Sequence, residues 1–289
     1  MQSIEARQRA EIFYRLHAGP DALILVNAWD AVSARVLEHG GVPAIATTSA
    51  GVAWSLGYAD GEQLPPDEFI AACARICRAA SVPVSVDIER GFGRSTEEVC
   101  AVVRTLIGLG VVGINIEDGV LPGTQRLAPP VVLCERIDAL RKMAAQMDAR
   151  LFINARTDTY VVANDDPLAR YEDTVRRAQL YASAGADGIF VPGLALEEEV
   201  VRFVRTVPLP VNIYAGYAGA PPVEALTRAG VRRVSLGCGP MQSALGLLRR
   251  IAIEAFEQGS YSAMSGSMLS VSEVNGLFRS PLGSHDRKG

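Results

Sequence analysis

Carboxylate side chains gather where two apolar runs of this chain end. Asp87 and Glu89 follow the run at residues 82–86, and Glu117 follows the run at residues 111–116. Side chains alternate between the two faces of a strand, so Asp87 and Glu89 point the same way, and Glu117 ends the next strand at the same height. Converging carboxylates repel one another unless a cation or a proton lies between them. The cluster therefore predicts a hard divalent cation, above all Mg²⁺.

The basic side chains narrow the chemistry further. None of the three histidines, His17, His39 and His285, lies at the end of a predicted strand, which argues against a histidine-bound zinc ion or a histidine general base. The two lysines, Lys142 and Lys288, lie in a predicted helix and in the C-terminal tail, which excludes a Schiff-base aldolase. Carboxylates, hydroxyls, amides and arginine remain, and they suit Mg²⁺ chelated by an oxygen-rich substrate.

Arg156 is the cation placed to meet such a substrate. It shares a strand face with Asn154. A 2-oxo acid would bind the metal through its carboxylate and carbonyl oxygens, and Arg156 would neutralise the negative charge that develops as a bond breaks toward a metal-held enolate. The alternative is a structural ion pair between Arg156 and Glu117, which would still line the site. Asp118 points away from Glu117, so a structural role is favoured for it.

Eight short apolar runs alternate with amphipathic stretches along the chain. The runs predict strands at residues 22–27, 44–47, 83–87, 113–117, 151–155, 188–191, 210–213 and 233–236. The stretches predict helices at residues 31–39, 67–80, 96–109, 131–146, 167–184, 196–206, 223–229 and 241–258. Strict alternation implies parallel strands joined by right-handed crossovers, and eight units favour an α/β fold of the closed (β/α)8 TIM-barrel type over an open sheet. Function in such a barrel gathers at the C-terminal ends of the strands, where the acidic cluster and Arg156 lie.

Two segments fall outside the eight units. Residues 1–20 contain a leading helix, predicted at 2–17, and residues 240–278 hold the eighth helix followed by a C-terminal arm rich in Ser, Gly and Met. This arm cannot build a strong core of its own, so we expect it to pack on a neighbouring subunit. Residues 280–289 are expected to form a disordered tail. The whole chain, 1–289, is predicted to be a single barrel domain.

Composition argues against several other partners. The 289 residues carry a net charge of -4, with 49% hydrophobic and 21% charged residues, so neither nucleic acid nor an anionic membrane is expected. No apolar run approaches the ~18–20 residues that span a bilayer. The five cysteines are scattered and odd in number, which is typical of a reduced, cytoplasmic protein.

Six short stretches at or after the predicted strand ends form a combined signature. They read Asn-Ala-Trp-Asp at 27–30, Thr-Ser-Ala-Gly at 48–51, Ser-Leu-Gly-Tyr-Ala-Asp at 55–60, Val-Asp-Ile-Glu-Arg-Gly-Phe-Gly at 86–93, Asn-Ile-Glu-Asp at 115–118 and Asn-Ala-Arg-Thr-Asp at 154–158. Together they resemble the isocitrate lyase/phosphoenolpyruvate mutase superfamily, over residues 12–278. The resemblance implies a (β/α)8 barrel whose eighth helix is swapped onto a partner subunit, in a homo-oligomer that is a dimer or a tetramer.

The resemblance also implies roles for individual residues. Asp87 would be the main direct ligand of Mg²⁺, with Mn²⁺ as an alternative ion, and Asp60, Glu89 and Glu117 would hold its water molecules. Position alone would make Asp60 part of an Asp-Gly turn. Catalysis is expected to involve Arg156 together with Glu117, Asp60 and Glu89. The residues expected to bind the substrate are Ser49, Ala50 and Gly51, at its carboxylate and oxo group, with Trp29, Asn212 and Arg156.

Two departures from the family pattern bear on the reaction. Glu89 stands where the family usually has aspartate, and its longer side chain would shift the water shell. The segment at residues 119–130 lacks the cysteine, histidine and lysine of the isocitrate and methylisocitrate lyase lid, and also the lysine and asparagine of the phosphonate enzymes. It is long for a barrel connection, typically ~2–6 residues. We expect a lid in which Arg126 contacts the substrate; the alternative is a passive connector.

Three functions remain open from the sequence. The first is a Mg²⁺-dependent lyase that cleaves a C–C bond of a small 2-oxo or 2-hydroxy dicarboxylic acid through a metal-stabilised enolate, as in oxaloacetate decarboxylation or methylmalate and methylisocitrate cleavage. Decarboxylation depends least on the proton donor that the lid lacks, because solvent can protonate the enolate. The second is C–P chemistry on phosphoenolpyruvate or phosphonopyruvate. The third is a barrel that binds a 2-oxo acid without turning it over.

Overall fold

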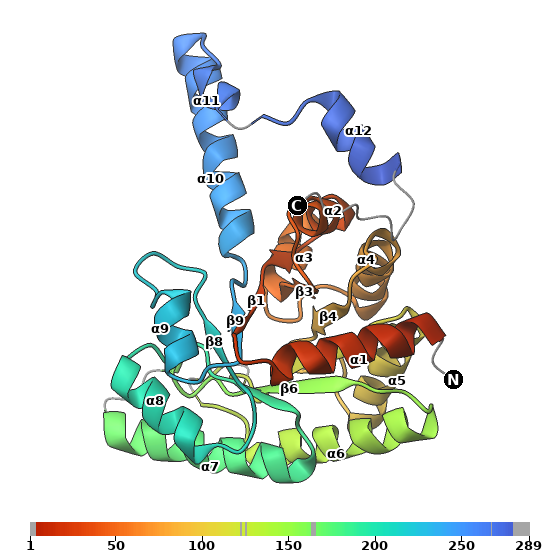
Figure 1. The fold of residues 1–289 in the computed structure, drawn as a ribbon, viewed down its shortest axis with the longest axis vertical. Helices are drawn as coiled ribbons and strands as arrows, with labels where there is room; N and C mark the ends of the chain where they lie inside the picture. The colour runs from red at the N-terminus through yellow and green to blue at the C-terminus, as the bar shows by residue number, and fades with distance from the viewer. Residues whose placement is uncertain (1–3, 122, 125, 163–165, 267, 280–289) are drawn as a thin grey trace.

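The structure, a computed structural model, describes residues 4–121, 123–124, 126–162, 166–266 and 268–279 (Figure 1). In these ranges one sheet has the strand order β1-β9-β8-β7-β6-β5-β4-β3-β2, and neighbouring strands run parallel. The strands are β1 (Leu23–Leu25), β2 (Asn27–Ala28), β3 (Ile45–Thr47), β4 (Val84–Asp87), β5 (Gly113–Glu117), β6 (Phe152–Arg156), β7 (Gly188–Phe190), β8 (Val211–Tyr214) and β9 (Arg233–Ser235). β1 pairs with β9 and β2 pairs with β3, so the sheet closes on itself. The (β/α)8 barrel is confirmed, with its predicted first strand interrupted at Val26.

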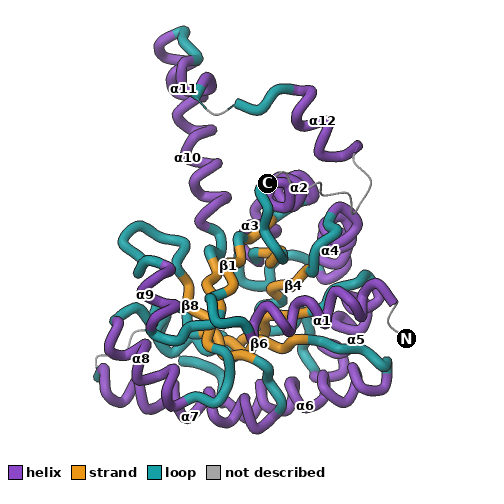
Figure 2. Tube along the Cα trace, viewed as in Figure 1, coloured by secondary structure: helices purple, strands orange, loops and turns teal. Residues whose placement is uncertain are grey.

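Most of the helices cover the outside of the barrel between successive strands, whereas the first crosses one end of the barrel and the tenth projects away from it (Figure 2). They are α1 (Ile4–Ala18), α2 (Ala31–His39), α3 (Ser49–Ser55), α4 (Pro66–Ala79), α5 (Thr96–Gly108), α6 (Pro130–Gln146), α7 (Pro167–Ala184), α8 (Glu197–Thr206), α9 (Val223–Arg228) and α10 (Gly239–Ile253). The eighth predicted helix, at residues 241–258, ends where the observed helix ends, because α10 continues into a π-helical turn, η1 (Glu254–Gln258). α3 was not predicted, since a seven-residue helix that contains glycine has little intrinsic propensity.

α1 closes the N-terminal end of the barrel. Its buried residues Ala10 and Phe13 pack against Leu25 and Phe152 from the strands. A Cβ atom at Gly113 would lie 2.7 Å from the Phe13 ring, so glycine at this strand position lets α1 approach. A larger apolar layer lies between the strands and the surrounding helices. Apolar side chains thus fill the barrel at this end, which leaves the opposite end for polar residues.

The C-terminal segment stands away from the barrel. α10 projects outward, and after α11 (Ser262–Ser265) the chain returns so that α12 (Val271–Arg279) lies beside α2 (Figure 1). Arg35 of α2 anchors this return, because its Nε donates to the Leu277 carbonyl oxygen at 2.6 Å. The predicted exchange of this segment between subunits stays a prediction.

Three further predictions from the sequence concern the C-terminal tail, membrane-spanning helices and the cysteines. Residues 280–289, predicted to be disordered, lie outside the described residues. Within the described ranges, no helix has both the length and the apolar character needed to cross a membrane. All five cysteines are free thiols, and the predicted cytoplasmic location stays a prediction.

Candidate active site at the barrel mouth

Asp87 lies at the end of β4, at the mouth of the barrel. Its backbone N–H donates to Thr47 Oγ1 at 2.9 Å, and its Oδ2 accepts from the backbone N–H of Ser49 at 3.4 Å. Its Oδ1 is buried and has no hydrogen-bond partner among the described residues. Burial raises the pKa of Asp87 above its usual range, while Arg156 and the hydrogen bond from Ser49 oppose the rise. A cation would satisfy such an orphaned carboxylate oxygen.

Glu89 and Asp60 approach Asp87 from two loops. Glu89 is buried and has a left-handed backbone, with φ of +49°. Its carbonyl oxygen accepts from the Glu117 N–H at 2.9 Å, which ties this turn to β5. Burial, followed by the charges of Asp60 and Asp87, raises the pKa of Glu89 to about 8. Asp60 is exposed, and its negative charge acts on both Asp87 and Glu89.

Arg156 lies between two carboxylates at the end of β6. Its Nε and Nη2 donate to the two oxygens of Asp158 at 2.6 and 3.0 Å. Its Nη1 lies 3.0 Å from Glu117 Oε2, an ion-pair distance without the alignment of a hydrogen bond. Burial lowers the pKa of Arg156, but Glu117, Asp158 and Asp87 together raise it above its usual value, so the guanidinium stays charged. Burial raises the pKa of Glu117 well above its usual range, and Arg156 opposes that rise.

The predicted substrate-binding residues Ser49, Ala50 and Gly51 form the first turn of α3. Thr48 caps this helix, since its Oγ1 accepts from the Gly51 N–H at 3.5 Å. A Cβ atom at Gly51 would lie 2.6 Å from Thr48 Cγ2 and 2.9 Å from Trp29 Cβ, so only glycine fits. Trp29 therefore packs directly against this turn, beside Ser49, whose backbone N–H donates to Asp87.

Two predicted substrate contacts make no hydrogen bond or ion pair with the carboxylates in the described part of the chain. Asn212 is 1% exposed inside the barrel, where its Oδ1 accepts from Ser235 Oγ at 3.2 Å. Its Nδ2 has no partner among the described residues. Arg126 is exposed on the loop at 119–130, and its carbonyl oxygen accepts from the Leu121 N–H at 2.8 Å. The substrate contacts of Asn212 and Arg126 therefore stay predictions.

The side chains at the mouth can be tested for their fit to a divalent ion. Across the described residues, no group of three or more His, Cys, Asp or Glu is arranged to hold an ion directly. The buried Asp87 Oδ1 nevertheless has no donor among the described residues, and the charge of Asp87 interacts with those of Asp60, Glu89 and Glu117. The residues fit an ion held by one or two carboxylates and otherwise by water, which is how Mg²⁺ is usually bound.

Asp158 was missed by the sequence predictions, although it makes the two hydrogen bonds that orient Arg156. The available signal was its position, two residues after an arginine at a strand end. Asp118 supports it from behind, because its Oδ1 accepts from the Asp158 N–H at 3.1 Å. Asp118 Oδ2 accepts from Arg177 at 2.9 Å and from Tyr181 at 2.8 Å, which is the structural role expected for it.

Comparisons with known proteins bear on the class of this site. A family model described as phosphoenolpyruvate phosphomutase matches residues 13–256. An uncharacterized protein of Mycobacterium tuberculosis is 36% identical, over 81% of this chain and 84% of its own. An oxaloacetate decarboxylase of Pseudomonas fluorescens is 30% identical, over 91% of this chain and 88% of its own. A solved Burkholderia cenocepacia structure, provisionally named a lyase/mutase, has a TM-score of 0.88 at 33% identity and covers 96% of this chain and 98% of its own.

Proposed function

Because the chain belongs to the phosphoenolpyruvate mutase/isocitrate lyase superfamily, we propose that it is a Mg²⁺-dependent lyase acting on a small 2-oxo or 2-hydroxy dicarboxylic acid. It would cleave a C–C bond whose electrons pass into an enolate, as in oxaloacetate decarboxylation or the cleavage of a methylmalate or methylisocitrate. The relative from Pseudomonas fluorescens is named for the first of these reactions.

The observation that best supports this proposal is that Asp87, a buried carboxylate with an oxygen that accepts no hydrogen bond, lies near the positively charged Arg156. Asp87 Oδ1 is buried without a donor, and the charge of Arg156 acts on the same carboxyl group. When bound, Mg²⁺ would draw electron density from the oxygens of a 2-oxo acid. The residues that would hold it are Asp87 directly and Asp60, Glu89 and Glu117 through water.

The chain's own groups would bind and orient the substrate. Under this proposal the turn of Ser49, Ala50 and Gly51 binds the carboxylate and oxo group. Arg156, held in place by Asp158, neutralises the negative charge that grows as the C–C bond breaks. Because Asp158 and Glu117 already fix the guanidinium, little reorganisation accompanies the charge transfer.

The loop at 119–130 favours decarboxylation within this class. It contains no cysteine, histidine or lysine that could deliver a proton. Decarboxylation of a 2-oxo dicarboxylate leaves an enolate that solvent can protonate, whereas cleavage of a hydroxy acid also needs a base for the hydroxyl proton. Arg126 would contact the distal carboxylate of the substrate from this loop.

A second candidate is C–P chemistry on phosphoenolpyruvate or phosphonopyruvate. The family model that matches this chain carries the name of a phosphomutase, which favours this alternative. The same acidic cluster and arginine would serve both reactions, so the products must separate them. A barrel that binds a 2-oxo acid without turnover is the third candidate.

The test is product identification with a defined set of substrates. The purified protein is incubated with Mg²⁺ and oxaloacetate, 2-methylisocitrate, 2,3-dimethylmalate, phosphonopyruvate or phosphoenolpyruvate, and followed by carbon and phosphorus NMR. We expect pyruvate with carbon dioxide from oxaloacetate at a rate well above that with Mg²⁺ alone, and no increase over that background with Asp87→Ala. Asp138→Ala, which removes an exposed carboxylate paired with Lys142, is the matched control and should react like the wild type.

Each outcome assigns a different function. A phosphorus shift without loss of carbon would move the assignment to the phosphomutase type. Mg²⁺-dependent binding of a 2-oxo acid with no product from any compound would support the binding-only barrel. Turnover that persists in Asp87→Ala would contradict the proposed metal site.

We also propose that the working form is a homo-oligomer in which the C-terminal segment covers a neighbouring subunit. Leu248 and Phe256 are 61% and 94% exposed on this segment. Large apolar side chains that gather on one surface mark interaction sites, and C2 or D2 symmetry is the common way to bury them. This form is a dimer or a tetramer.

A further inference from the structure

Two loops beside the acidic cluster hold an unusual backbone. Four non-glycine residues in the described part of the chain have a left-handed φ, and three of them are Glu62 (+57°), Glu89 (+49°) and Phe92 (+54°). L-residues other than glycine seldom adopt this conformation, and it persists only where surrounding contacts determine it. Glu62 follows Asp60 in one loop, and Glu89 and Phe92 belong to the turn after β4. The contacts between these two loops should therefore show which residues hold Asp60 and Glu89 in place.

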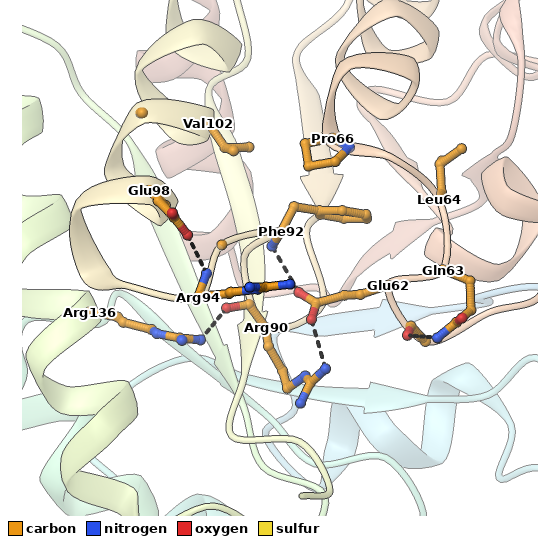
Figure 3. Close-up of a pocket in the computed structure, with 13 residues that line it drawn as sticks. Glu62, Gln63, Leu64, Pro66, Arg90, Phe92, Arg94, Glu98, Val102 and Arg136 are labelled. Atoms are coloured by element: carbon orange, nitrogen blue, oxygen red, sulfur yellow. Dashed lines mark hydrogen bonds and ion pairs between the residues drawn. The ribbon is translucent and has the colours of Figure 1, made fainter. Parts of the chain in front are cut away.

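Glu62 makes those contacts. Its Oε1 accepts from the Phe92 backbone N–H at 2.8 Å, and its Oε2 forms an ion pair with Arg90 Nη2 at 2.8 Å. Figure 3 shows the Glu62 carboxylate between the Phe92 backbone and the Arg90 guanidinium. Glu62 thus binds both the backbone and the arginine of the opposite turn.

Arg90 extends this connection to the loop at 119–130. A Cβ atom at Gly119 would lie 2.7 Å from Arg90 Cδ and 2.8 Å from Cγ, so the Arg90 stem lies against the first residue of that loop. Arg136 of α6 donates to the Arg90 carbonyl oxygen. Gly91 and Gly93 fix the same turn, because a Cβ atom at either would lie 2.7 Å from Val99.

Glu62 and Arg90 also line a surface groove that lies outside the acidic cluster. The groove has a volume of about 970 Å³ and is lined by Glu62, Arg90 and Phe92 together with Glu98 of α5 (Figure 3). The Glu62 side chain is 15% exposed there and the Arg90 side chain 31%. Glu98 only caps its own helix, through Ser95 and Arg94. Glu98 therefore provides a matched control: its carboxylate lies in the same groove but, in the described part of the chain, binds the backbone of Arg94 and Ser95 and neither Glu62 nor Arg90.

We infer that Glu62 and Arg90 are positioning residues that hold the Asp60 loop and the Glu89 turn at the separation needed to share the water shell of one ion. The inference rests on the proposed Mg²⁺ site. Neither residue touches the substrate; they act through Asp60 and Glu89. Removing the charge of Glu62 or Arg90 allows the two loops to move apart. The affinity for the ion then falls, without a direct effect on the step that breaks the bond. Loss of a residue that orients the groups around a metal ion lowers metal affinity about 10–100-fold.

Isothermal titration with Mg²⁺, and with Mn²⁺ as a second probe, tests this in the absence of substrate. Glu62→Gln keeps an acceptor for the Phe92 N–H but removes the charge, and Arg90→Met keeps the stem on Gly119 but removes the guanidinium. We expect the Kd to rise about 10-fold or more in each single variant, and no further in the double variant, because the two residues act as a pair. Glu98→Gln should bind like the wild type.

The outcomes separate this inference from the proposed function. Wild type that binds neither ion removes the metal site itself, and with it both proposals. Wild type that binds, with an unchanged Kd in both Glu62→Gln and Arg90→Met, overturns the positioning role alone. An equal loss in Glu98→Gln also overturns it, since the groove in general would then be responsible. If Glu62→Gln does not fold, the comparison of Arg90→Met with Glu98→Gln decides.

Discussion

Arg156 owes its position to a residue two places further along the chain. Asp158 accepts two of its N–H groups, and Asp118 in turn holds the backbone of Asp158. Two parallel bonds of this kind fix the plane of a guanidinium as well as its place. Arg156 would therefore meet developing charge without moving, and this is where electrostatic stabilisation contributes most to a rate.

Replacing Asp158 with Asn should lower turnover and leave Mg²⁺ binding essentially unchanged. The Asn side chain has one acceptor oxygen, so it cannot hold both N–H groups, and Arg156 would swing toward Glu117. We expect kcat to fall about 10²-fold, the cost of displacing a catalytic group by ~1 Å. Steady-state kinetics and ion titration measure the two effects, with Asp138→Asn as the control. Unchanged kcat in Asp158→Asn would show that the pair does not position Arg156.

The alternation of side chains along a strand is enough to predict which residues share a face. It places Asp87, Glu117 and Arg156 at one end of the barrel. It could not predict the partner of Arg156 or the left-handed backbone of Glu89, because both lie in turns after a strand ends. Turn conformation depends on contacts from other loops, such as the hydrogen bond that the Phe92 N–H donates to Glu62 Oε1.

At the scale of elements, α1 seals the barrel with an uncharged histidine. His17 is 3% exposed and stacks on Phe152, with ring centroids 4.0 Å apart. Its Nδ1 donates to the Phe13 carbonyl oxygen at 2.8 Å. Burial, and then the positive charge of Arg233, lowers the pKa of His17 to about 3. The folded protein therefore keeps this ring neutral at a pH where the unfolded chain would protonate it.

This difference predicts a loss of stability in mild acid. The folded pKa of about 3 lies below the usual 6.5, so the stability is fully present above pH 6.5 and is lost as the pH falls toward 3. Between pH 6.5 and 5 the loss is about 2 kcal/mol of unfolding free energy. Urea unfolding of wild type and His17→Gln at both pH values measures it. The variant should lack that part of the pH dependence, and His39→Gln, at an exposed site, should retain it. If the unfolding free energy changes equally with pH in wild type and His17→Gln, the buried neutral His17 is not the cause.

Most elements were predictable because each carries its own signal. Amphipathic periodicity predicted α2 and α7 with their observed bounds, and Asp30 and Asp166 cap the two helices. The break at Val26 and the short α3 carry no such signal. α3 forms because Gly51 lets the chain pack against Trp29, and this requirement appears only once the barrel is assembled.

At the scale of the whole molecule, the barrel and its C-terminal segment follow different rules. The barrel buries its helices against its own strands, so its sequence pattern is sufficient to predict it. α10 has one buried residue, Met241, and after it the chain exposes large apolar side chains such as Leu248 and Phe256. In the proposed homo-oligomer a neighbouring subunit would cover them, and no pattern within one chain specifies that arrangement.

The C-terminal segment should therefore decide the oligomeric state. We expect the wild type to be a dimer or a tetramer by light scattering coupled to size-exclusion chromatography. The double variant Leu248→Arg/Phe256→Arg should be a monomer, because two buried charges without partners cost several kcal/mol at each interface. Leu196→Arg, at a residue 66% exposed next to α8, changes the charge of a different surface and should keep the wild-type mass. A wild type that is already monomeric, or a double variant with unchanged mass, would mean that the segment serves some purpose other than assembly.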